Sequence, residues 1–118
     1  MMRLNTETIR YQPDERIEDY IKLKIGKLDR FMPRYARRNA HADVKLKGGP
    51  GRGKKLYSCE VIIHIPSETI TTSQAAESMN AAVDMTEAKL KNQLKKYKEK
   101  HTLNRRRALR RLVGRIRR

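Results

Sequence analysis

The sequence of 118 residues has one cysteine, no tryptophan and one phenylalanine. A single thiol, Cys59, excludes a disulfide within the chain, and its alternation with apolar neighbours predicts a place in the core. The histidines His41, His64 and His101 lie far apart and lack metal-ligand spacing with Cys59, so no metal site is predicted. No Ser-His-Asp or paired-carboxylate motif stands out. We therefore expect a protein that is not an enzyme and that carries no cofactor.

Long apolar segments are also lacking. None approaches the roughly 20 residues that a membrane span needs, and the opening stretch MMRLNTETIRYQ has no apolar core of a signal peptide. Together with the single cysteine, these absences predict a soluble protein of the reducing cytoplasm.

Negative charge is scarce as well. Asp and Glu number 13 against 29 Lys and Arg, which gives a net charge of +16 and a pI near 10.5. Such an excess repels itself in the compact state, so a polyanionic partner that neutralises it is the readiest explanation. Nucleic acid is the leading candidate and an anionic membrane surface is the second. A merely solvated basic surface is the third reading.

Hydrophobic periodicity predicts four strands and two helices. The segments with the alternation or the β-prone composition of strands are residues 2–9, 40–47, 56–65 and 69–73. Helical spacing follows Pro13 and is expected to end at Pro33, and it returns from about Met79. The last three strands have short connections and should be antiparallel, whereas the helical crossover should make the first two strands parallel if they are neighbours. The order predicts an α+β fold, β-α-β-β-β-α, with both helices on one face of a four-stranded sheet.

The stretch GGPGRGKK, Gly48 to Lys55, is one residue away from a phosphate-binding P-loop. A P-loop opens a helix, because the helix N-terminus supplies the N–H groups that hold phosphate, but a strand is predicted after this stretch. Lys55 also stands where the Mg²⁺-binding hydroxyl is needed. The sequence therefore favours a hairpin tip over nucleotide hydrolysis, and it leaves open that Arg52, Lys54 and Lys55 touch phosphates as a flexible finger.

Both predicted helices carry rows of basic residues beside their apolar stripes. Each residue turns a helix by about 100°, so the row on the second helix lies within about 60° and is bordered by Asn92; it consists of Lys89, Gln93, Lys96 and Lys100. The row on the first helix is Arg16, Lys27, Arg30 and Arg34. Lys24 falls inside the apolar arc, and we expect its ammonium to reach the edge. If the helices lie side by side, the rows border one groove or one ridge and match phosphates along a folded RNA, although lysines that only solubilise a helix are the alternative.

Two segments, YIKLKIGKLDRF in the first helix and NAAVDMTEAKLKNQLKKYKEK in the second, resemble the ribosome hibernation-promoting factors, also called protein Y or ribosome-associated inhibitor A. The resemblance covers about residues 2–101 and is to the short form, because the second domain of long members is not found here. The chain departs from the family at Glu77-Ser78-Met79-Asn80, where many members have E-D-M-Y.

The resemblance implies a fold like that of double-stranded-RNA-binding domains. It also implies a partner, the ribosome, with binding to small-subunit RNA at the decoding region between the subunits. The protein would block messenger RNA and A- and P-site transfer RNA and stop translation under stress or in stationary phase. No membrane or small-molecule substrate is implied, and we expect a monomer away from the ribosome. The alternative is a constitutive ribosomal protein or a general structured-RNA binder.

Residues 1–102 are expected to form the ribosome-binding domain, and residues 103–118 a basic tail that is disordered or folds on binding. Eight arginines follow Asn104. Apolar residues recur among them at helical spacing, and we expect the tail to follow the messenger-RNA channel; membrane association by the tail is a further alternative. The resemblance and the rows together predict RNA contacts by Lys24, Lys27, Arg30, Arg34, Lys89, Asn92, Gln93, Lys96, Lys100, Arg105, Arg106 and Arg107.

Overall fold

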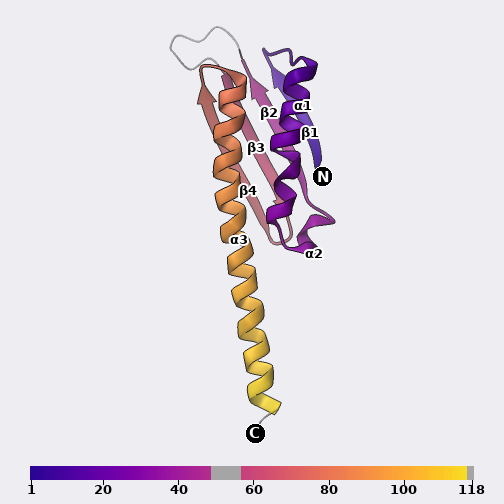
Figure 1. Ribbon diagram of the computed structural model, residues 1–118, viewed down its shortest axis with the longest axis vertical. Coiled ribbons are helices and arrows are strands. Elements are labelled where there is room, and N and C mark those ends of the chain that lie inside the picture. The colour runs from indigo at the N-terminus through magenta and orange to yellow at the C-terminus, as the bar shows by residue number, and fades with distance from the viewer. Residues whose placement is uncertain (49–56, 117–118) are drawn as a thin grey trace.

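The computed structural model describes residues 1–48 and 57–116, with side chains described up to residue 101. Four strands form one sheet in the order β1-β2-β3-β4 (Figure 1), and their bounds are Arg3–Ile9, His41–Lys47, Tyr57–Ile65 and Glu68–Ala76. β1 is parallel to β2, and the other pairs are antiparallel. The predicted element order and strand directions are thus confirmed, as is the α+β class.

The central strands form because their side chains alternate between the core and the opposite face of the sheet. Ala42, Val44 and Leu46 on β2 are buried, as are Val61 and Ile63 on β3, and Val44 pairs with Val61 across the strands. β-branched side chains suit this pleated, half-buried surface. Cys59 lies in the same buried row, which confirms its predicted place in the core.

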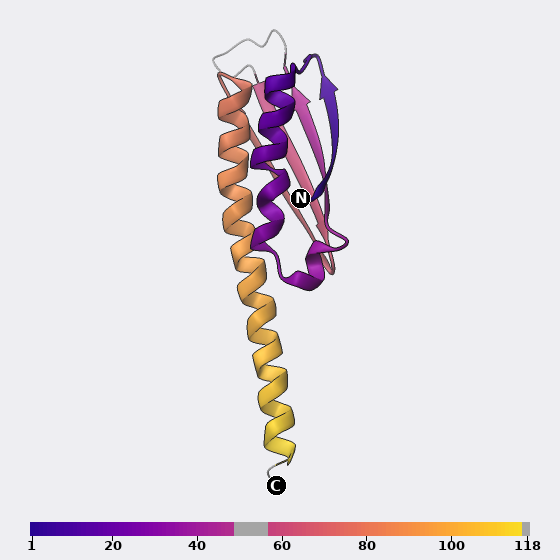
Figure 2. The ribbon, with the colours of Figure 1, turned by 45° about the vertical axis from the view of Figure 1, so that its right-hand side comes forward.

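Two helical segments cover the same face of the sheet and leave the other face bare, as the side view in Figure 2 shows. α1 (Glu15–Lys24) begins after Asp14, whose carboxylate accepts a hydrogen bond of 2.9 Å from the backbone N–H of Ile17 and so satisfies one unpaired donor of the first turn. α3 (Met79–Ile116) packs on β3 and β4. Its Leu90 and Leu94 are fully buried, so this apolar stripe faces the sheet as the spacing predicts.

The prediction of one first helix ending at Pro33 is wrong. α1 ends at Lys24, a 3₁₀ segment η1 follows over Gly26–Phe31, and a short α2 spans Arg34–Arg37. The carbonyl of Gly26 accepts a hydrogen bond from the backbone N–H of Met2 at 3.0 Å. Glycine is also a weak helix former. The α-helix therefore gives way to the tighter 3₁₀ turn at Gly26, where the backbone bonds to Met2, the residue before β1.

The helix α3 has 38 residues, which corresponds to a length of about 57 Å. Its C-terminal part projects beyond the sheet (Figure 1), and residues 102–116 continue the helical backbone. Whether the segment from residue 103 is a separate unit that folds on binding stays a prediction. The predicted finger residues Arg52, Lys54 and Lys55 lie outside the described residues. In the part of the chain that the structure describes, no helix is long and apolar enough to cross a membrane.

Candidate nucleic-acid interface

The exposed surface of α3 has two flanks, one on each side of its buried stripe. Lys91 and Lys95 each follow a buried leucine by one residue and lie on the flank that faces η1. Gln93, Lys96 and Lys100 lie on the opposite flank, where they line a groove beside β4. The helix therefore forms a ridge with basic side chains on both sides.

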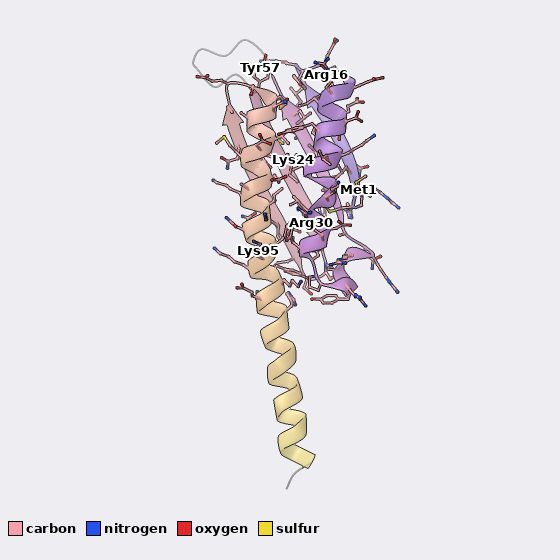
Figure 3. All side chains as sticks on the ribbon, in the orientation of Figure 1. Met1, Arg16, Lys24, Arg30, Tyr57 and Lys95 are labelled. Carbon is pink, nitrogen blue, oxygen red and sulfur yellow. The ribbon has the colours of Figure 1, made fainter. Side chains whose placement is uncertain are left out.

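On the η1 side, three cations surround one aromatic ring, and we call Arg30, Phe31, Lys91 and Lys95 the Phe31 cluster. The Cζ atom of Arg30 lies 4.9 Å from the ring centroid, and the Nζ atoms of Lys91 and Lys95 lie at 5.2 and 5.7 Å. Figure 3 shows Arg30 on the η1 side and Lys95 on α3. The ring attracts each cation with about 0.5–1 kcal/mol at an exposed site.

None of the three cations forms an ion pair among the described side chains. They carry like charges and so repel one another. The Phe31 cluster is therefore a concentrated positive site that a polyanion would stabilise.

The β4 flank is built on the turn between β3 and β4 and on one tyrosine. The hydroxyl of Tyr97 donates a hydrogen bond of 3.0 Å to the carbonyl of Pro66 in the β3–β4 turn, which ties α3 to the sheet below Lys96 and Lys100. Glu68 lines the same groove, and its carboxylate lies 3.8 Å from Nε2 of His101. The lysines of this flank have no ion pair among the described side chains.

The sequence left open whether the two basic rows border a groove or a ridge. In the structure, α3 is a ridge that lies between Arg30 on one side and the second row on the other. Arg30 lies beside one flank of α3, whereas Gln93, Lys96 and Lys100 lie beyond the other. Lys91 and Lys95 were missed because the predicted row was sought on the other flank. Their one-turn spacing was visible in the sequence, but only the position of η1 shows that this flank completes a cluster.

Lys24 is placed differently from the other predicted contacts. Its Nζ lies 3.9 Å from Asp84 and 3.8 Å from Glu87, both on α3, and 5.6 Å from the ring centroid of Tyr20. Figure 3 shows it between the two helices. The hydroxyl of Tyr20 donates a hydrogen bond to Asp84, and this bond raises the pKa of Tyr20 to about 12. The ammonium reaches the edge of the apolar arc as predicted, but two carboxylates offset its charge.

The remaining predicted contacts are on the surface or beyond the described side chains. Lys27 on η1, Arg34 on α2, and Lys89 and Asn92 on α3 are exposed. The backbone of the segment that contains Arg105, Arg106 and Arg107 is helical, and their side chains lie outside the described residues.

The structure buries the thiol and brings two of the histidines together. Cys59 is fully buried, and burial raises the pKa of its thiol to about 11. The sheet register brings together two histidines that are far apart in sequence, because His41 pairs with His64 and their rings stack at 4.5 Å. Nε2 of His64 lies 2.9 Å from Asp43, and this hydrogen bond lowers the pKa of the carboxyl. Within residues 1–48 and 57–116, no group of three or more His, Cys, Asp or Glu could hold a metal ion.

Comparison with known proteins identifies the family. The family described as Sigma 54 modulation protein / S30EA ribosomal protein matches residues 4–102. The chain belongs to this family. The S30EA-family chain is also 34% identical over 82 residues to the ribosome hibernation promotion factor of Staphylococcus aureus (strain COL). That match covers 70% of this chain but 40% of the relative, so the chain spans less than half the length of that protein.

Solved structures share the fold of this S30EA-family chain. The N-terminal domain of Thermus thermophilus Protein Y superposes with a TM-score of 0.68 at 23% identity, covering 82% of this chain and 99% of that one. A ribosomal subunit interface protein from Coxiella burnetii gives 0.66 at 20% identity, covering 83% and 99%. These likenesses confirm the four-stranded sheet with helices on one face.

Proposed function

We propose that the chain is a ribosome hibernation factor. It binds the small ribosomal subunit at the decoding region, blocks messenger RNA and A- and P-site transfer RNA, and inhibits translation under stress or in stationary phase. Family membership supports the ribosome as the partner. The observation that carries the proposal is the Phe31 cluster, because three cations held on one rigid surface without carboxylate partners call for a polyanion.

Two flanks of the ridge contact RNA in this proposal. Phosphate contacts position a protein on RNA without reading its sequence, and each one releases counterions and so adds affinity that salt removes. The η1 flank contributes Lys27 together with the Phe31 cluster, and the β4 flank contributes Lys89, Lys96 and Lys100. Lys24 is expected to add less, because Asp84 and Glu87 already offset its charge.

The mechanism is competitive occlusion, in which no bond is made or broken. The folded domain is pre-organised, since the buried stripe of α3 and the bond from Tyr97 to Pro66 fix the ridge on the sheet. Little ordering entropy is then lost on binding. The helical segment after residue 103 continues the ridge, and we place its arginines along the messenger-RNA channel.

The test is charge reversal at three exposed lysines of the interface. Lys27→Glu, Lys89→Glu and Lys96→Glu together should abolish inhibition of translation in a purified system and release the protein from small subunits. The matched control reverses Arg10, Lys22 and Lys47, which are also exposed but lie outside both flanks. Equal inhibition by the interface variant, or equal loss in the control, would reject the proposed surface. Binding that persists without competition with transfer RNA would instead favour a constitutive ribosomal protein.

A further inference from the structure

A second basic site lies at the end of the sheet where β1 and β2 begin. A pocket there is lined by Arg3, Arg37 and Arg38, together with Asn39 and His41 and the first residues of the chain. None of these residues belongs to the predicted RNA-contacting set. We call the three arginines and their pocket the arginine pocket.

The fold, rather than sequence proximity, assembles the arginine pocket. The parallel register pairs Arg3 with His41, so the first strand brings one arginine close to the two in the short segment before β2. Arg37 is fixed, because its Nε donates to the carbonyl of Met32 and its Nη2 to that of Arg30, each at 3.1 Å. A guanidinium has five N–H donors, so three remain on Arg37 for other acceptors.

The charge of the pocket is not offset by its lining. No Asp or Glu lines it, and in the described part of the chain none of the three arginines forms an ion pair. The nearby Asp29 contacts the amino group of Met1 at 3.8 Å. Three like charges around one concavity repel one another, and an anion seated among them would remove this cost.

We propose that the arginine pocket binds a phosphate group. The planar fork of Arg matches two phosphate oxygens at once, and the ring of His41 is held in place by its stack on His64. The group comes either from a free phosphate compound or from an RNA backbone. The bond from Arg37 to the carbonyl of Arg30 links the pocket to a residue of the Phe31 cluster, and the RNA source of the phosphate is a strand that also contacts this cluster.

The test uses the full chain with Arg3→Ser and Arg38→Ser combined. Arg37 is left intact because its two carbonyl bonds stabilise the fold. The matched control carries Arg10→Ser and Lys22→Ser, which remove the same charge from exposed positions elsewhere. Calorimetric titration with inorganic phosphate and with pyrophosphate, against chloride at constant ionic strength, measures the free-phosphate source. Filter binding to a small-subunit RNA fragment measures the backbone source.

A free phosphate site predicts pyrophosphate binding that the pocket variant weakens by about tenfold or more and the control does not. If the phosphate belongs to an RNA backbone, pyrophosphate shows no binding that depends on the pocket. The slope of log RNA affinity against log salt then falls by about 2 in the pocket variant, which is more than in the control. The inference is overturned if the pocket variant matches the control in both assays. The pyrophosphate assay contains no ribosome, so its result is independent of the proposed function.

Discussion

Neutralising the Phe31 cluster should change the salt dependence of ribosome binding by a calculable amount. The variant replaces Arg30, Lys91 and Lys95 with Gln and keeps Phe31. None of the three charges is offset by a carboxylate in the described structure, so each is available for a full phosphate contact. One contact contributes about 0.9 to the slope of log K against log salt, so the three together contribute about 2.7.

The slope contribution of about 2.7 also gives the expected change in affinity at each salt concentration. Relative to 1 M salt, three contacts are worth about 500-fold at 0.1 M but only about sixfold at 0.5 M. The variant should therefore bind small subunits about 500-fold more weakly at the lower salt and only about sixfold more weakly at the higher. Each lost ring contact costs about 0.5–1 kcal/mol, but relief of repulsion among the cations opposes this loss, so the melting temperature should change little.

The assay is equilibrium binding to purified small subunits at five salt concentrations between 0.1 and 0.5 M, roughly the range in which the slope is linear. A second variant, Phe31→Leu, keeps all charges and removes the ring face, so its slope should match wild type while its affinity falls. A slope that stays the same in the triple-Gln variant would refute the assignment of phosphate contacts to this cluster.

Three other predictions concern the C-terminal tail, the hydrogen bond from Tyr97 to Pro66 and the thiol of Cys59. Deleting residues 104–118 should weaken ribosome binding and flatten its salt dependence, and unchanged binding at low and high salt would reject a role for the tail. Tyr97→Phe removes the bond to Pro66 and should lower the free energy of unfolding by about 1 kcal/mol in a urea titration, and no loss would show that the bond is not made. Because burial raises the pKa of Cys59 to about 11, the native thiol should resist a disulfide reagent at about pH 8 until urea unfolds the chain; rapid labelling of the native protein would contradict its burial.

The strands were predictable because alternation and burial coincide in them. Val44 and Val61 illustrate this, since each lies in a period-two row and each is buried. The prediction for β4 stopped at Ser73, yet the strand continues to Ala76. Gln74 to Ala76 have little strand propensity of their own, and they are held by pairing with the first residues of β3.

The break after α1 was not predictable from apolar spacing. Ile21, Ile25 and Leu28 fit an α-helix, but Ile25, Leu28 and Phe31 also fit the three-residue turn of a 3₁₀ helix. The bond between Gly26 and Met2 decides between them, and it joins residues that sequence periodicity does not relate.

The candidate site was predictable in kind but not in composition. The surplus of charge and the lysine rows pointed to helix-borne phosphate contacts, and Gln93, Lys96 and Lys100 do share one flank. The pairing of Lys24 with Asp84 and Glu87, and the gathering of Lys91 and Lys95 around Phe31, depend on how α1 and η1 lie against α3. The contact of His41 with His64 likewise depends on the strand register.

Competition with transfer RNA tests the central claim most directly. The apparent dissociation constant of the protein for small subunits programmed with messenger RNA is measured at increasing P-site transfer RNA. Occlusion predicts a rise of about tenfold when transfer RNA reaches about ten times its own dissociation constant. An unchanged constant, with the protein and transfer RNA bound to the same particle, would contradict the account.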